Sequence, residues 1–182
     1  MPLAELELQL ERIKRSPSER GSLVLIVRRP AVDAREVIEE AELDDRSGLV
    51  GDSWLARAEV STPDGSIGRE TQITMANVRS IEAVAGDSTR VPLAGDQLFV
   101  DFDLSEQNVP PGTLLEVGSA LLEVSSVPHR GCGKFSSRFG VDALKFVNSA
   151  SGRALNLRGI NTRVVRGGVV RGGDAVVKLK PA

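Results

Sequence analysis

The chain has one cysteine, one histidine and no tyrosine among its 182 residues. A lone cysteine cannot form an intramolecular disulfide, which favours a cytoplasmic protein over a secreted one. One cysteine and one histidine also cannot supply the ligands of a Cys/His zinc site. No apolar run reaches the length of a membrane span, and the acidic start at Met1–Glu5 does not resemble a signal peptide.

Charge and aromatic content narrow the class of partner further. The net charge is -2 at pH 7, and aromatic residues make up 3% of the chain. A nucleic-acid-binding domain usually has a basic balance, and a surface that stacks bases needs aromatic rings. We therefore expect no nucleic-acid partner and no membrane partner, and we expect a small-molecule substrate.

The hydrophobic pattern predicts a short helix followed by one larger domain. Leu3, Leu6, Leu10 and Ile13 recur at helical spacing and predict an amphipathic helix over residues 3–15. We assign residues 1–20 to an N-terminal helical extension. Residues 21–182 are then a single domain, since a chain of this length buries one stable core.

Short segments with turn residues between them dominate the rest of the chain. Gly118-Ser119 lies between two apolar segments and predicts a β-hairpin. Asp33 and Glu36 resemble a capping box and predict a helix that runs to residue 41. The predicted strands are 22–28, 71–74, 98–102, 114–117, 120–124, 162–166, 169–171 and 175–179, and further helices are predicted over 75–86 and 141–147. Many short strands and few helices favour a mainly β fold, a closed or partly open barrel with short flanking α-helices.

The only cysteine and the only histidine lie three residues apart, in His129-Arg130-Gly131-Cys132. A thiolate can act as a nucleophile, a persulfide carrier or a soft metal ligand. Gly131 and Gly133 flank the cysteine and would let a ligand approach the backbone closely. A buried structural cysteine is the alternative, but such residues usually lie in apolar runs, and this one lies among basic residues and glycines.

His129 follows a proline at the end of a predicted strand. It could act as a general base for Cys132 or donate a hydrogen bond to an anion, or it could simply bond to the backbone. A Cys–His hydrolase would also need a residue that orients the imidazole. Asn148 and Asp142 are candidates for that role, although no protease signature surrounds the cysteine.

Several sequence blocks, in a shared order, resemble the MOSC domain found at the C-terminus of molybdenum cofactor sulfurases. The resemblance covers most of the chain from about residue 45 to residue 180. Its blocks are GDQLFVD at 95–101, LS at 104–105, PPG at 110–112, PHRGCGKF at 128–135, RFG at 138–140, LRGI at 157–160 and GGD at 172–174.

This resemblance implies a β-barrel that binds the molybdenum cofactor. In the family, a cysteine ligates molybdenum or is proposed to carry sulfur, and Cys132 is the only residue here that matches it. A basic surround would hold the phosphate of the pyranopterin, and the matching residues are Arg130, Lys134, Arg138 and Arg158. Many family members also carry a His-Gly-Gly segment upstream, where this chain has GRETQIT at 68–74 without histidine.

Three functions follow as hypotheses. The first is a molybdenum-cofactor-binding oxidoreductase component that acts on small N- or S-oxygenated substrates, with Cys132 and His129 as catalytic residues. The second is a sulfur-carrier or cofactor-handling module that uses a Cys132 persulfide. The third is a non-catalytic barrel with a vestigial site. Because the chain has no flavin motif and no iron–sulfur cysteines, either active role would need a separate electron-donating reductase or sulfur donor protein.

Overall fold

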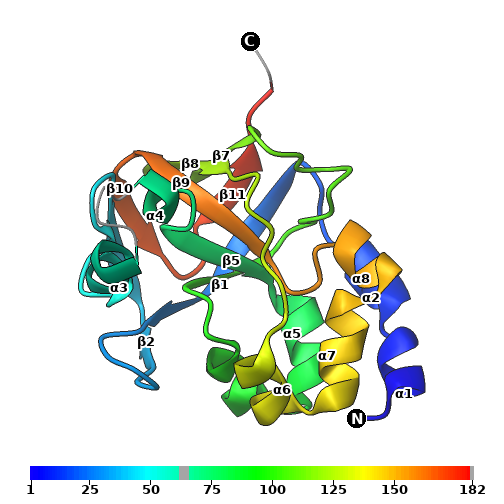
Figure 1. Ribbon diagram of the computed structural model, residues 1–182. Helices are drawn as coiled ribbons and strands as arrows, with labels where there is room; N and C mark the ends of the chain where they lie inside the picture. The colour runs from blue at the N-terminus through cyan, green and yellow to red at the C-terminus, as the bar shows by residue number, and fades with distance from the viewer. Residues whose placement is uncertain (62–65, 181–182) are drawn as a thin grey trace.

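The computed structural model describes residues 1–61 and 66–180 and shows a β-barrel with helices packed against one side (Figure 1). Seven strands close the barrel, in the order β11-β7-β8-β9-β5-β6-β1, with β1 pairing back to β11. The barrel strands are β1 (Arg20–Arg28), β5 (Ile73–Asn77), β6 (Leu98–Asp101), β7 (Leu114–Val117), β8 (Ala120–Val124), β9 (Ile160–Arg166) and β11 (Ala175–Lys178). The predicted mainly β barrel with flanking helices is therefore confirmed.

Strand β1 closes the barrel because it is long enough to pair with three neighbours. Its first residues pair with β11, with Arg20 opposite Val177, and its middle pairs with β6. Its last residues pair with an additional strand, β2 (Glu36–Ile38). Neighbouring strands are antiparallel except β5 and β6, which run parallel. The β7–β8 hairpin has the register expected from Gly118-Ser119, with Val117 opposite Ala120.

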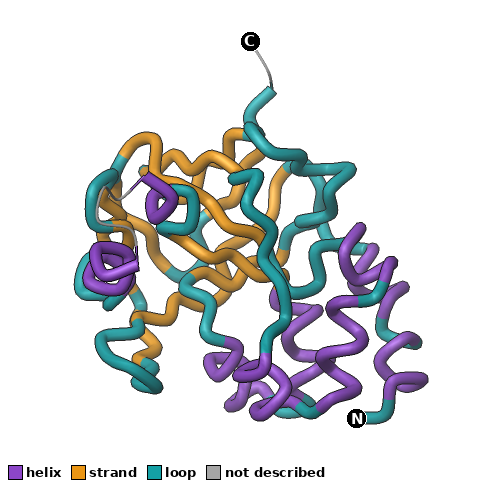
Figure 2. Tube along the Cα trace, viewed as in Figure 1, coloured by secondary structure: helices purple, strands orange, loops and turns teal. Residues whose placement is uncertain are grey.

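Alternation along the strands separates two hydrophobic cores. Leu98 and Val100 of β6 point into the barrel core, and Phe99 between them belongs to the core under the helices. This is the two-residue period of a strand that is buried on both faces. The barrel thus shares one wall with a helical layer, and Figure 2 shows the two regions side by side.

The helical layer covers β5 and β6. Helices α1 (Leu3–Glu7), α2 (Leu10–Lys14), α5 (Val78–Ala85), α6 (Gly133–Phe139), α7 (Val141–Asn148) and α8 (Ala150–Ala154) form it, together with a 3₁₀ helix over Ser88–Ala94. Phe135, Phe139 and Phe146 fill its core with Phe99. The helix predicted over 3–15 is two short helices in one amphipathic stretch, whose Leu6 and Ile13 are both buried in this layer.

A second, smaller sheet lies beside the barrel in the order β10-β3-β4. Its strands are β3 (Glu40–Asp44), β4 (Gly48–Leu49) and β10 (Gly168–Arg171). Two further helices, α3 (Trp54–Ser61) and α4 (Ser66–Arg69), follow on the same side in Figure 1.

The helix predicted to begin at Asp33 is wrong, because this stretch forms β2 and β3. Asp33 has φ 61°, whereas an N-cap residue is extended. Ala41 and Leu43 are buried on alternate positions of β3, and pairing with β10 and β4 fixes that period. Pairing with β1 and β10 thus overrides the local helical pattern.

The helix predicted from residue 75 begins only at Val78, since Met75 belongs to β5. The helix predicted over 141–147 is confirmed as α7.

Asn77 joins the barrel to the helical layer. Its side-chain oxygen caps α5 by accepting from the Arg79 backbone N–H at 2.9 Å. Its amide nitrogen donates to Ser16 Oγ at 2.8 Å and to the Phe102 carbonyl at 2.9 Å. We predict that Asn77→Ala lowers the free energy of unfolding by about 3 kcal/mol, because it removes one cap and two buried hydrogen bonds.

Urea denaturation measures this loss. Asp87→Ala is the matched control, because Asp87 caps the 3₁₀ helix at an exposed position. Asp87→Ala should lower the free energy of unfolding clearly less than Asn77→Ala does. Equal losses in the two variants would contradict the role of Asn77 as a buried junction.

Candidate functional site

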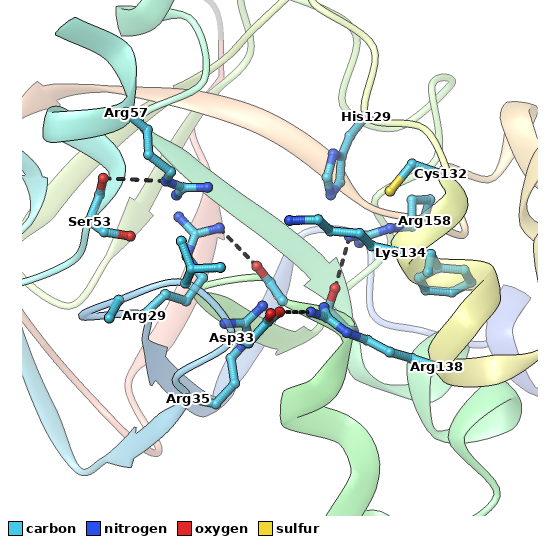
Figure 3. Close-up of a pocket in the computed structure, with 15 residues that line it drawn as sticks. Arg29, Asp33, Arg35, Ser53, Arg57, His129, Cys132, Lys134, Arg138 and Arg158 are labelled. Atoms are coloured by element: carbon cyan, nitrogen blue, oxygen red, sulfur yellow. Dashed lines mark hydrogen bonds and ion pairs between the residues drawn. The ribbon is translucent and has the colours of Figure 1, made fainter. Parts of the chain in front are cut away.

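Cys132 opens onto a pocket of about 200 Å³ between the barrel and the helical layer (Figure 3). We call it the Cys132 pocket. Its wall comes from four parts of the chain: the β1–β2 connection, the start of α3, the Ala94–Gly95 turn and the segment from residue 129 into α6, with Arg158 at its base. The lining residues are Arg29, Ala31, Val32, Asp33, Arg35, Ser53, Arg57, Ala94, Gly95, His129, Cys132, Lys134, Phe135, Arg138 and Arg158.

The Cys132 thiol is exposed and lies immediately before α6. Its partial burial raises its pKa, but the backbone N–H groups of Phe135 and Lys134 and the charges of Arg158 and Arg138 outweigh that effect. The pKa of the thiol is therefore below its ordinary value. A lowered pKa increases the thiolate fraction at neutral pH, and the thiolate is the form that binds metals and attacks electrophiles.

A buried carboxylate holds the base of the pocket together. Asp96 is fully buried and faces two partners. One carboxylate oxygen lies 2.9 Å from His129 Nε2, and the other accepts from Arg158 at 2.6 Å. Burial alone would raise the pKa of Asp96, but Arg158 and His129 together lower it far below the ordinary value, so Asp96 stays ionised.

Because Asp96 is ionised, the nitrogen of His129 that faces it carries the proton. Burial and the nearby Arg158 lower the pKa of His129, and they outweigh the opposing effect of Asp96. The imidazole is therefore neutral at pH 7, and Nδ1 keeps its lone pair. Among the described residues, Nδ1 has no hydrogen-bond partner.

Arg158 is a buried cation at the base of the pocket. It donates to Asp96 and to the Ala94 carbonyl, and its guanidinium lies 5.0 Å from the centre of the Phe135 ring. Its Nε is buried without a partner among the described residues. Gly159, the next residue, has φ 109°, and a Cβ there would lie 2.5 Å from the Met75 carbonyl. The close approach of this loop to β5 therefore requires glycine at 159.

On the opposite wall, Asp33 bridges to the helical layer. It pairs with Arg138 at 2.8 Å, and Arg138 also donates to the Leu93 carbonyl at 3.0 Å. Arg35 lies beside them, and its Nε is a second buried guanidinium nitrogen without a partner among the described residues. Burial lowers the pKa of Arg35, and the nearby charges of Arg138 and Arg29 lower it further.

Positive charge exceeds negative charge around the pocket, even with Arg57 left aside. Arg29 is held by Asp52 through both carboxylate oxygens, at 2.8 and 2.9 Å. Apart from Arg57, five cations line the pocket, and three carboxylates pair with three of them, so these eight residues carry a balance of two positive charges. The cations are Arg29, Arg35, Lys134, Arg138 and Arg158, and the carboxylates are Asp33, Asp52 and Asp96. Such a pocket favours an anionic ligand.

Helix α7 fixes the backbone next to the cysteine. Asn148 accepts from the Gly131 N–H and donates to the Gly131 carbonyl, each at 3.0 Å. A Cβ on Gly131 would lie 2.8 Å from Leu144 and 2.9 Å from Val147. Gly131 therefore packs against α7, whereas a Cβ on Gly133 would meet open space. Asn148 thus orients the cysteine loop, and Asp142 instead lies 3.6 Å from Lys145.

The structure brings most of the candidate residues together. Cys132, His129, Lys134, Arg138 and Arg158 line the Cys132 pocket, with Gly131 and Gly133 on either side of the thiol. Arg130 lies elsewhere and lines a separate hollow.

Sequence reasoning missed Asp96 as the partner of His129, although Asp96 belongs to the GDQLFVD block at 95–101. It also missed Ser53 and the arginines at 29, 35 and 57, which belong to no motif and reach the pocket only through the fold.

Within residues 1–61 and 66–180, no cluster of three His, Cys, Asp or Glu side chains could hold a metal ion. In the same residues, no helix is long and apolar enough to cross a membrane.

We predict that the pKa of Cys132 lies below that of an ordinary cysteine and rises in Arg138→Gln, because that variant removes a cation that stabilises the thiolate. The rate of iodoacetamide alkylation against pH measures it directly, since the chain has no other thiol. Arg163→Gln is the matched control, because Arg163 pairs with Glu123 and does not line the pocket. If Arg138→Gln left the midpoint pH of the alkylation rate unchanged, that result would contradict the electrostatic explanation.

Comparison with solved structures supports the fold. The YuaD protein of Bacillus subtilis matches with a TM-score of 0.62 at 17% identity, over 89% of this chain and 97% of that one. YiiM from Escherichia coli matches with a TM-score of 0.58 at 19% identity, over 90% of this chain and 71% of that one. YiiM from Geobacillus stearothermophilus matches with a TM-score of 0.58 at 16% identity, over 88% and 75% of the two chains. At these identities the matches show a shared fold.

A search of curated proteins finds no match. The model of the MOSC domain family, by contrast, matches residues 62–177, which is more than half of the chain. The match runs from before β5 into β11 and contains the cysteine segment between β8 and α6. The chain therefore belongs to the MOSC domain family.

Proposed function

We propose that the Cys132 pocket binds the molybdenum cofactor, with the Cys132 thiolate as the protein ligand of molybdenum. The MOSC domain family is associated with binding of this cofactor. The observation that carries the proposal is an exposed thiol of lowered pKa on a pocket with an excess of guanidinium groups. Thiolates are suitable ligands for soft metal centres, and guanidinium groups bind phosphate.

The residues present fit the anionic part of this cofactor. Arg35 and Arg158 line the pocket, and each has a buried Nε without a partner among the described residues. Arg138 is now paired with Asp33, whose side chain is 70% exposed, so Arg138 can exchange that carboxylate for a phosphate at little cost. We assign Arg35, Lys134, Arg138 and Arg158 to the pyranopterin phosphate and its surroundings.

When bound, the cofactor would supply two-electron chemistry that suits the reduction of small N- or S-oxygenated substrates. His129 lines the same pocket, with its Nε2 proton directed to Asp96 and its Nδ1 lone pair available. We assign it the movement of protons at Nδ1, because the neutral imidazole is held in one tautomer by a carboxylate that stays ionised. A separate reductase protein would provide the electrons.

A second candidate is a sulfur carrier, which the exposure and lowered pKa of Cys132 also favour. In that reaction the Cys132 thiolate attacks the outer sulfur of a persulfide on a donor protein. A sulfur–sulfur bond forms at Cys132, the donor's sulfur–sulfur bond breaks, and the donor leaves as a thiolate. The proton on the transferred sulfur moves with it, so no external oxidant is required.

Elemental analysis separates the two candidates. We expect near-stoichiometric molybdenum in the wild-type protein purified from a host that makes the cofactor. We expect none in Cys132→Ala, because the ligand is lost, and reduced content in the double variant Arg35→Gln, Arg138→Gln, because the anion loses two partners. Arg163→Gln again serves as the control and should retain the metal.

Molybdenum absent from the wild-type protein would overturn the cofactor proposal. Persulfide labelling after incubation with a persulfide donor would then test the second candidate, with Cys132→Ala as the blank. A Cys132 that neither binds molybdenum nor accepts sulfur would favour the vestigial barrel.

A further inference from the structure

The Cys132 thiol has no second cysteine in the chain with which to react. An oxidised Cys132 therefore cannot be converted into an intramolecular disulfide. The thiol is exposed, and in Figure 3 its sulfur points into the Cys132 pocket. A thiolate that a small disulfide can reach attacks one of its sulfurs and forms a mixed disulfide. The stable product of such an exchange is Cys132 linked to one half of the small disulfide, and that half then lies in the pocket.

Positive charge lies around this sulfur on three parts of the fold. Arg35 belongs to the β1–β2 connection, Arg138 to α6 and Arg158 to the loop before β9, and all three line the pocket. The charges of Arg158 and Arg138 act at the sulfur itself, since both lower the pKa of the thiol. The same charges attract a negative group attached to the sulfur and repel a positive one. The pocket thus distinguishes incoming disulfides by their charge.

Two of these arginines also have a buried nitrogen without a partner. The Arg158 side chain is 8% exposed, and its Nε has no hydrogen-bond partner among the described residues. The Nε of Arg35 is buried without a partner in the same part of the chain. A buried donor that is left unpaired costs free energy, which an acceptor on a ligand can recover. A carboxylate has only acceptors and matches guanidinium groups well, so these donors favour a carboxylate on the attached half.

The volume of the pocket limits the size of the attached half. The pocket measures about 200 Å³, whereas one water molecule takes up about 30 Å³ of the liquid, so there is space for roughly seven waters. A short-chain thiol carboxylate fits this space. A peptide thiol or a nucleotide thiol would extend through the mouth into solvent, where the charge on its distal part is screened. The pocket therefore favours the smallest anionic thiols.

We propose that Cys132 is a site of mixed-disulfide formation that selects small thiols bearing a carboxylate. The Cys132 thiolate attacks one sulfur of a symmetrical disulfide. A sulfur–sulfur bond forms at Cys132, the sulfur–sulfur bond of the disulfide breaks, and the other half leaves with the electron pair as a thiolate. Cys132 is oxidised and the leaving half is reduced, so the small disulfide is the only oxidant. Arg35, Arg138 and Arg158 surround the carboxylate of the attached half. This reaction does not rest on binding of the molybdenum cofactor.

Three disulfides of similar length test the selection. 3,3′-Dithiodipropionate is anionic, cystamine is cationic and 2-hydroxyethyl disulfide is neutral. Mass spectrometry follows the mixed disulfide on the full-length protein, purified from a host that does not make the cofactor. The same rates on the urea-unfolded protein correct for the intrinsic reactivity of each disulfide. We expect folding to raise the ratio of the anionic to the cationic rate roughly tenfold, with the neutral disulfide between them.

Substitutions in the pocket should move this rate ratio in both directions. Arg35→Gln and Arg138→Gln each remove a positive charge and should lower the ratio about threefold. Asp33→Asn removes a negative charge and should raise the ratio, and asparagine tolerates the positive φ of this residue. A general loss of packing would not produce changes of opposite sign. Arg163→Gln lies outside the pocket and should leave the ratio unchanged.

Three outcomes would overturn the proposal. A rate ratio that folding leaves unchanged or lowers would refute selection by charge. A raised ratio that is the same in Arg35→Gln, Arg138→Gln and Asp33→Asn would show that the Cys132 pocket is not its source. The absence of any adduct on the folded protein would refute the site itself. Because no metal is involved, each of these results is independent of the molybdenum content that tests the proposed function.

Discussion

The buried carboxylate of Asp96 is the interaction on which the site depends. A charge removed from water is tolerated only when partners compensate it, and here Arg158 and His129 do so from two loops that are distant in sequence. The compensation also determines what each partner can do. Arg158 is fixed under the pocket, and His129 presents a neutral nitrogen away from Asp96. Removal of this one carboxylate would leave an unpaired buried guanidinium and a histidine free to adopt either tautomer.

The sequence predicts the local parts of this arrangement better than their assembly. Turn chemistry and periodicity predict the hairpin at Gly118-Ser119, the strand β1 and the helix after Gly140. The stretch after Asp33 does not, because its conformation depends on the edges of β1 and β10, which lie far away in sequence. The residues of the site are likewise harder to predict where the fold alone brings them together. Cys132 and His129 stand out by their rarity, whereas Arg29 and Arg35 resemble any surface arginine until the β1–β2 connection places them beside α6.

The backbone is held in place on both sides of Cys132. Behind it, Asn148 holds the Gly131 peptide through both of its polar groups and so ties the loop to α7. In front of it, α6 begins, and Phe135 packs against Arg158. The thiol is therefore exposed although the backbone that carries it is fixed. A ligand at the sulfur meets a rigid support, which reduces the entropy lost on binding.

The barrel closes only when its first and last strands, β1 and β11, pair with each other. The pairing of β1 with β11 joins Arg20 to Val177, residues 157 positions apart in the sequence. Contacts of such separation slow folding, since a long loop must be ordered before they form. While a ribosome is still synthesising the chain, β1 has no β11 to pair with, and its edge stays open until the last strand has emerged. This open β1 edge is the state in which the protein is most prone to pair with another chain.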